Sequence, residues 1–303
     1  MAGPEDGSAF SARLRSWPIP LLEQAYGRRD AVLYALNVGV GELEDAAALD
    51  FVREDGEAVL PTFPTVLVPN SPWLFDPENG IDCRALMMRE LTIELHRPIP
   101  REGAITFQER IGPILDRGEG KGAVLHLVGE LRDRASGAHV ATIERVTMAM
   151  RNGGFGGIPA PRVPAPSFPD RAPDRVDRHG TRKDSTLFFC LHGDNHPVHS
   201  DPAFATAMGY PGLVLHGMCT LGIIAQKLLV GYADYQAARF RSISITFKAP
   251  VFPGETLAIQ SWKEDGQLLF QATAEGRSIV VAQGIAEITT AEIAAGAGTQ
   301  SLR

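Results

Sequence analysis

The strongest pattern in the chain is an alternation of apolar and polar residues, which occurs in two separate groups of runs. The first group covers Ala104–Glu109, Ala123–Leu131 and Val140–Met150, and the second covers Thr256–Trp262, Leu268–Ala274 and Ile279–Thr289. Alternation broken by glycine-containing segments is typical of antiparallel strands that bury one face. The sequence therefore predicts an antiparallel sheet in each half of the chain.

The two halves resemble each other beyond their strands. Similar Pro- and Gly-containing segments, HRPIPREG at 96–103 and KAPVFPGE at 248–255, precede the first strand of each group. Each half also has a helix candidate before its strands. The one at Met218–Ala233 is apolar nearly all round, as expected of a helix wrapped by a sheet. A helix against a curved antiparallel sheet, repeated twice, predicts the α+β class and a tandem (double) hot-dog fold. Two unrelated α+β domains are the alternative.

A boundary between the halves is predicted from Gly153 to Lys183. The segment begins with the run GGFGG and then contains six prolines: Pro159, Pro161, Pro164, Pro166, Pro169 and Pro173. Proline lacks an amide donor and favours extended backbone, so this composition indicates a linker. The predicted units are an N-terminal domain over 1–152, the linker over 153–183 and a C-terminal domain over 184–303.

Composition limits the classes of function. The 303 residues are 44% hydrophobic and 21% charged, which is typical of a globular protein, and the net charge of −7 argues against nucleic-acid binding. The three cysteines are far apart, which fits a reducing compartment. No run is apolar enough for a signal peptide or a membrane span. We therefore expect a cytoplasmic protein; the ending Ser-Leu-Arg differs from the Ser-Lys-Leu peroxisomal signal.

The loop GDNHPVH at 193–199 carries the strongest candidate chemistry. Asp194 and His199 are separated by Pro197, which disfavours a continuous helix, so both side chains could point from one irregular loop into a cleft. Asp201 followed by Pro202 predicts a capped helix over Pro202–Met208 that would hold this loop. A carboxylate and an imidazole can share one water, accepting and donating protons. A solvated loop without catalytic function is the alternative.

A second candidate lies at Gly217, where the apolar helix is predicted to begin. Amides at a helix N-terminus carry partial positive charge and suit a developing oxyanion, and glycine permits close approach of a ligand. An ordinary glycine at a helix start is the alternative.

A metal site is a further alternative at this place. His192, His196 and His199 have the spacing H-x3-H-x2-H, and Asp194 and His216 are near. The cluster lies on a predicted loop and lacks the helical spacing of the common zinc hydrolase motif, so no metal is predicted.

Taken together, these segments resemble the hydratase-2 (MaoC-like) family, which includes the hydratase domain of peroxisomal multifunctional enzyme type 2. The family loop is roughly LSGDxNPLHxDP, and residues 191–202 here are LHGDNHPVHSDP. Similar segments include LHGMCTLG at 215–222, FKAPVFPG at 247–254, RDAVLYALNVG at 29–39 and LPTF at 60–63. The resemblance covers about residues 20 to 290.

The resemblance implies an (R)-specific 2-enoyl-CoA hydratase of fatty acid metabolism, a hydro-lyase without metal or redox cofactor. By position, Asp194 and His199 would be the acid/base pair and the Gly217 amide would bind the thioester oxygen. Phe247 and Arg117 fall at positions that contact acyl-CoA in the family. A core role for Phe247 and a solvated turn for Arg117 are the alternatives. One site per chain is predicted, and a homodimer is compatible with the sequence.

Three positions depart from the family pattern. His196 replaces the family Asn that helps to hold the water, His192 replaces a small residue, and Met88-Arg89 replaces a His-Gly that touches CoA. His196 would still hydrogen-bond the water as a further catalytic residue, the adjacent Asn195 would bind the substrate, and Arg89 would add a phosphate contact. These changes are equally compatible with a shifted substrate or a weakened enzyme. An acyl-CoA-binding or scaffolding protein and a hot-dog acyl-CoA thioesterase are therefore the alternative functions.

Overall fold

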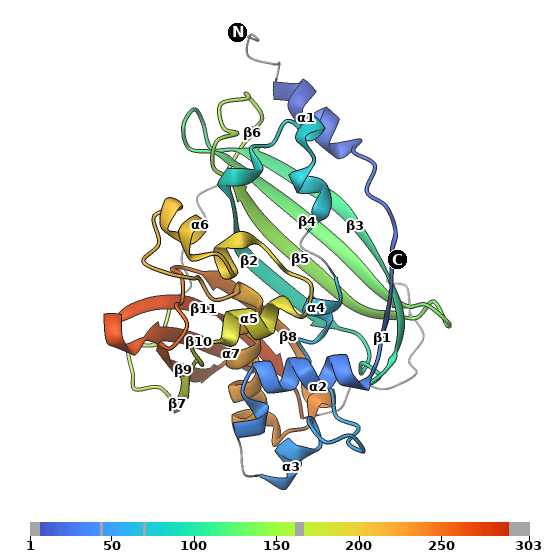
Figure 1. Cartoon of the computed structure of the whole chain (residues 1–303), viewed down its shortest axis with the longest axis vertical. Coiled ribbons are helices and arrows are strands. Elements are labelled where there is room, and N and C mark those ends of the chain that lie inside the picture. Colours follow the sequence, from blue (N-terminus) through green and yellow to red (C-terminus); the bar gives the residue numbers. More distant parts are fainter. Residues whose placement is uncertain (1–6, 43–44, 69–70, 161–166, 291–303) are drawn as a thin grey trace.

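The computed structural model describes residues 7–42, 45–68, 71–160 and 167–290, and these form one continuous sheet flanked by helices (Figure 1). The sheet has 11 strands. On its main path the first half contributes, in spatial order, β1 (Leu22–Tyr26), β3 (Gly103–Asp116), β4 (Ala123–Asp133), β5 (His139–Ala149) and β2 (Leu86–Leu95). The second half continues it with β8 (Phe240–Phe247), β11 (Ile279–Ile288), β10 (Gln267–Ala274), β9 (Thr256–Glu264) and β7 (Arg175–Gly180).

The six predicted strands are confirmed within a few residues of their ends, except that β3 continues as far as Asp116. The strands that join the halves, β2 and β8, were not predicted. They pair antiparallel, with Leu91 opposite Ile245 and Ile93 opposite Ile243, and these four side chains are buried on the helix side of the sheet. On the other side, the Thr92 hydroxyl donates to the Ser244 hydroxyl at 2.9 Å. At this junction, as in the rest of the sheet, one face is buried against the helices and the other face points away from them.

The long helix of the second half is α7 (Gly217–Ala233), and it confirms the predicted helix over Met218–Ala233. It lies against the second-half strands (Figure 1), and its apolar side chains are buried all round, as its sequence predicts. The shorter helices α5 (Ser185–Cys190) and α6 (Pro202–Ala207) precede it.

The first half has only short helices among its described residues. They are α1 (Gly7–Arg15), α2 (Arg28–Asn37), α3 (Ala46–Leu49) and α4 (Pro64–Leu67). The region between α3 and β2 is rich in proline, and it forms 3₁₀ turns at Pro72–Phe75, Pro77–Asn79 and Cys83–Ala85. Proline interrupts helical hydrogen bonding, which explains why this half has no counterpart of α7 in length.

The predicted linker is partly regular structure. Residues Ile158–Pro159 form β6, which pairs in parallel with β3, and Arg175–Gly180 form β7, which pairs with β9 at the end of the sheet. Prolines 161, 164 and 166 lie outside the described residues. β7 has no proline and alternates exposed with more buried residues, so this part of the segment belongs to the second-half sheet.

Gly222 allows α2 to approach α7 closely. A Cβ at this position would lie 2.5 Å from Val38 Cγ1 and 2.7 Å from the Tyr34 hydroxyl oxygen, both at buried residues. We expect Gly222→Ala to lower the free energy of unfolding by about 1–3 kcal/mol through overpacking, as measured by denaturant titration. Gly276→Ala is the matched control, because nothing lies within 4 Å of that Cβ. Equal stabilities of the two variants would contradict the packing argument.

Candidate active site

A cavity of about 830 Å³ lies between the two halves. The second half contributes the loop that carries Asp194, His196 and His199, and the first half contributes Phe63, Val66 and Arg145 among others. The volume is in the range of pockets that take small organic ligands. The loop singled out in the sequence therefore faces a half-open cavity and not only bulk solvent.

Local sequence explains the shape of this loop. Pro197 begins a 3₁₀ turn over Pro197–His199, and the amide of Val198 donates to Nδ1 of His196 at 3.3 Å. The Asp201 carboxylate then accepts from the amides of Ala203 and Phe204, which confirms the predicted cap of α6. The loop is thus held between a short turn and a capped helix.

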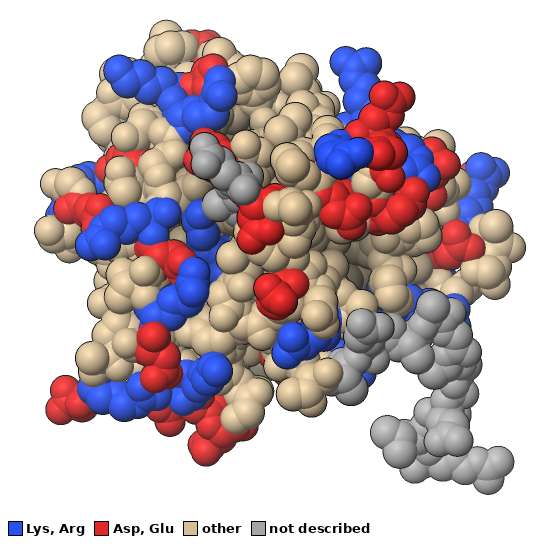
Figure 2. All heavy atoms as spheres, turned by 90° about the horizontal axis from the view of Figure 1, so that it is seen from below, with Lys and Arg blue, Asp and Glu red and all other residues tan. Residues whose placement is uncertain are grey.

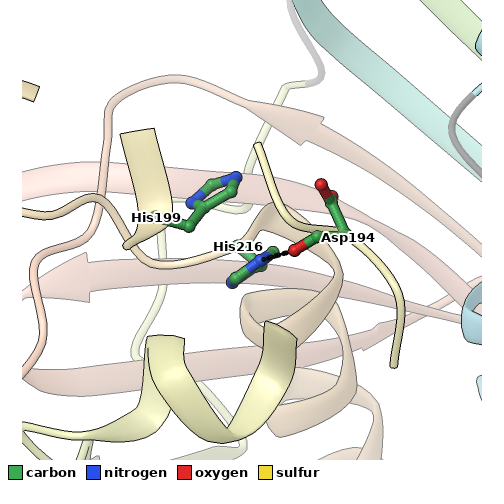
Figure 3. A group of neighbouring side chains, drawn as sticks. All are labelled: Asp194, His199 and His216. Atoms are coloured by element: carbon green, nitrogen blue, oxygen red, sulfur yellow. Dashed lines mark hydrogen bonds between the residues drawn. The ribbon is translucent and has the colours of Figure 1, made fainter. Parts of the chain in front are cut away.

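Asp194 and His199 line the cavity, and they lie next to His216, which is buried and is not a lining residue (Figure 3). One ligand-type atom from each lies within 4.8 Å of the others. His216 comes from the residue that precedes α7, and its Nε2 donates to the backbone carbonyl of Asp194 at 3.0 Å. Its ring stacks on that of His199, with centroids 3.6 Å apart. His216 therefore contacts the ring of His199 and the backbone of Asp194.

The protonation of His199 follows from its contacts. Its Nδ1 lies 2.7 Å from the carbonyl oxygen of Val214, and because a carbonyl only accepts, Nδ1 carries a proton. In the neutral ring, Nε2 is then a free acceptor. Burial lowers the pKa of His199 below its ordinary value of 6.5, although the Val214 carbonyl and the Asp194 carboxylate act in the opposite direction. The resting side chain at neutral pH is therefore a base.

The other histidines of the predicted metal alternative are engaged elsewhere. Nε2 of His192 is bonded to the Asn37 amide at 2.8 Å, and burial lowers the pKa of His192 to about 4. His196 lines the cavity, and the centroid of its ring lies 5.6 Å from that of Phe204 and 6.1 Å from that of His199. The set of His192, His196 and His199 is not brought together. The described residues that could hold a metal are Asp194, His199 and His216.

Gly217 is the first residue of α7, where no preceding turn supplies an acceptor for its amide. A Cβ at Gly217 would lie 3.2 Å from the ring of Phe247, so this ring packs directly on the glycine backbone. The neighbour Met218 lines the cavity, whereas neither Gly217 nor Phe247 is among the lining residues. Gly217 and Phe247 therefore pack against each other next to Met218, which is part of the cavity wall.

The remaining predicted substrate-binding residues lie outside the cavity wall. Arg117 is in the turn after β3, where its amide donates to the carbonyl of Gly122. Arg89 sits at a bulge of β2, half exposed, and pairs with Glu90 at 3.4 Å. Asn195 is exposed on the loop that carries Asp194 and His199. The structure does not bring these three together.

Sequence reasoning missed two features of the cavity. From the sequence, His216 was considered only as a possible metal ligand. Its stacking on His199 joins residues from two separate elements, and a sequence pattern does not show such a contact. Arg145 was not considered at all, since it lies in an alternating strand where any inward residue is expected to be apolar. A charged residue at an inward position of a predicted strand was the signal that could have identified it.

The charge distribution gives no continuous basic surface on the face shown in Figure 2. Lysine and arginine side chains there are interspersed with aspartate and glutamate. In the described ranges, no helix is long and apolar enough to cross a membrane.

Comparison with known proteins places both halves in one family. The MFE-2 hydratase 2 N-terminal domain matches residues 24–152, and the MaoC like domain matches residues 165–283. The chain is 36% identical to 3-hydroxyacyl-thioester dehydratase Y of Mycobacterium tuberculosis, over 88% of this chain and 93% of that protein. It is 30% identical to the peroxisomal enoyl-CoA hydratase 2 of Arabidopsis thaliana, over 93% of this chain and 96% of that protein.

Solved structures agree with these sequence matches. A MaoC-like dehydratase from Phytophthora capsici superposes with a TM-score of 0.80 at 27% identity, covering 92% of this chain and 98% of that one. A Mycobacterium tuberculosis protein described as a double hot-dog superposes with a TM-score of 0.53 at 13% identity, over 92% and 97% of the two chains, and this likeness concerns the fold alone. The predicted tandem hot-dog is confirmed. The chain belongs to the MaoC-like hydratase 2 family.

Proposed function

We propose that the protein catalyses the reversible addition of water to a trans-2-enoyl-CoA, giving a (3R)-3-hydroxyacyl-CoA. The observation that carries this proposal is the convergence of Asp194 and His199 at the end of a cavity, beside the start of α7. The similarity to proteins named enoyl-CoA hydratase 2 and 3-hydroxyacyl-thioester dehydratase supports the same reaction.

The two side chains have distinct roles in this proposal. The Asp194 carboxylate orients the attacking water, and Nε2 of His199 takes a proton from it as the oxygen bonds to C3. The resulting imidazolium, stabilised by the nearby carboxylate, then gives the proton to C2. The water supplies both the hydroxyl group and the new hydrogen, so the reaction balances without a further reactant. His216 acts as a positioning residue through its stack on His199 and its bond to the backbone of Asp194.

The Gly217 amide would stabilise the negative charge that develops on the thioester oxygen. An amide at the first position of a 17-residue helix has no acceptor within the helix, and it carries the positive end of the helix dipole. Losing one such preorganised donor typically costs about 3–4 kcal/mol in the transition state. Phe247 would hold this backbone in place through its contact with Gly217.

We propose that no metal takes part. Adding water to the double bond needs a proton acceptor, a proton donor and a donor to the thioester oxygen, and in this proposal His199, Asp194 and the Gly217 amide supply these roles. Elemental analysis of the purified protein tests this part: a stoichiometric transition metal that is required for turnover would overturn it.

An absorbance assay tests the reaction itself. Hydration removes the conjugated C2=C3 bond, so the enoyl-thioester absorbance should fall with short and long trans-2-enoyl-CoAs. A thiol reagent in a parallel assay should detect no free CoA, which separates this activity from a thioesterase. Binding of acyl-CoA without loss of absorbance on any chain length would favour a scaffolding role.

The pH dependence follows from the lowered pKa of His199. The neutral imidazole is the active base, and burial lowers the pKa of His199 below its ordinary value of 6.5. We expect kcat/KM to be level from pH 8 to about 6.5 and to fall only at lower pH. Circular dichroism at each pH checks that the fold persists. A rate that instead rises on acidification through pH 6 would assign the donor role to a resting imidazolium.

We also propose a cytoplasmic location, supported by the free thiols of Cys83, Cys190 and Cys219. A homodimer stays a prediction, which the molar mass from light scattering would test.

A further inference from the structure

Arg145, which lines the cavity from the first half, belongs to a buried ion pair. Nη1 of Arg145 on β5 lies 2.9 Å from Oε1 of Glu109 on β3, and the two side chains are only 2% and 4% exposed. A buried pair is costly unless its remaining donors and acceptors are satisfied, so the partners of each group are informative.

Glu109 is fully satisfied within the protein. Its Oε1 also accepts from the Ser71 hydroxyl at 2.7 Å, and its Oε2 accepts from the indole of Trp73 at 2.8 Å. Three donors therefore hold the carboxylate in one orientation.

Arg145 is not satisfied in the same way. A guanidinium has five N–H donors, and the one acceptor found for it among the described residues is Glu109. Its Nε is buried without a partner. Unpaired buried donors cost free energy, which indicates that an acceptor from outside the protein completes this group.

The position of the pair supports this conclusion. Along β5, Arg145 lies between Ile143 and Ala149, which belong to two separate apolar clusters, and Arg145 and Thr147 both line the cavity. Along β3, Glu109 likewise lies between Phe107 of the first cluster and Ile114 of the second. The ion pair thus lies between two apolar clusters, and its Arg145 side faces the part of the cavity wall that the first half supplies.

We infer that Arg145 is a specificity-determining residue that binds an uncharged oxygen, a ketone or hydroxyl group, on the acyl group of the substrate. This inference rests on the proposed function and names the substrate class. A neutral acceptor is favoured over a carboxylate because Glu109 already neutralises the guanidinium. A second carboxylate would add an uncompensated negative charge in a buried place.

The wild-type protein provides the first test. Saturated acyl-CoAs of equal length are compared by calorimetry: an unsubstituted alkyl chain, chains with a ketone or hydroxyl group at successive carbons, and a chain ending in carboxylate. We expect at least one ketone or hydroxyl position to bind roughly 10-fold more tightly than the alkyl chain, and the carboxylate to gain nothing. Equal affinities at every position would overturn the inference, and so would a preference for the carboxylate alone.

A double variant provides the second test. Glu109→Gln/Arg145→Met removes both charges and leaves an amide oxygen for Ser71 or Trp73. The matched control is Glu130→Gln/Arg110→Met, which removes an ion pair of 2.8 Å from the exposed side of the same sheet. The preference for the oxygenated chain should disappear in the first variant and persist in the control. Persistence in both, with each variant folded by circular dichroism, would overturn the inference.

The hydratase reaction and the binding of an oxygen atom by Arg145 can be tested separately. Lack of enoyl-CoA hydration by the wild type on every chain would refute the proposed function, whereas the binding comparison does not depend on turnover. If the double variant fails to fold, the wild-type comparison decides the inference alone.

Discussion

His199→Gln and Asp194→Asn are each expected to lower kcat by roughly 10²- to 10⁴-fold with little change in stability. Glutamine cannot take the proton from water, and it cannot form the cation that returns this proton to C2. Asparagine keeps the shape of Asp194 but removes the charge that orients the water and stabilises the imidazolium. Both residues are only partly buried, so each variant should fold.

Steady-state rates of enoyl-CoA hydration measure this effect, with Ser200→Ala as the control. Ser200 is exposed and follows His199 directly, so its variant tests whether any change in this loop impairs the enzyme. A rate within a few-fold of wild type for either His199→Gln or Asp194→Asn would refute the assignment of that residue.

Arg145→Met alone should lower the free energy of unfolding by about 3–5 kcal/mol, because it leaves the Glu109 carboxylate buried without a counter-charge. Arg110→Met is the comparison. Its side chain is 63% exposed in its pair with Glu130, and such a pair contributes at most about 1 kcal/mol. Denaturant titrations of both variants give the two values.

The double variant Glu109→Gln/Arg145→Met extends this measurement. It should be more stable than Arg145→Met alone, because removing both charges avoids the uncompensated carboxylate. A single variant as stable as wild type would mean that water reaches Glu109, and the description of the pair as buried would then be wrong.

The sequence predicted local structure better than pairing. The alternation in Ala123–Leu131 and the all-apolar surface of Met218–Ala233 were sufficient to predict a strand and a helix. β2 and β8 have similar alternation, but no local pattern specifies that two strands about 150 residues apart are neighbours. That contact depends on the assembly of both halves.

In the candidate site, too, local contacts were predictable from the sequence and contacts between distant elements were not. Asp194 and His199 belong to one short loop whose turn and cap follow from Pro197, Asp201 and Pro202, so their proximity was predictable. The stack of His216 on His199 joins that loop to the start of α7, and the pair of Arg145 with Glu109 crosses an intervening strand. Contacts of this kind are set by tertiary packing, which spacing along the chain does not encode.

The antiparallel junction of β2 with β8 has the geometry of a two-fold contact between equivalent strands, yet both strands belong to one polypeptide. In a dimer of identical subunits, any mutation that shortened a helix equivalent to α7 would shorten it in both copies. Covalent fusion ends that constraint. Among the described residues, only the second half has a long helix, α7, and only the first half carries the buried pair of Arg145 and Glu109. Each half can therefore change its side of the cavity without imposing the same change on the other side.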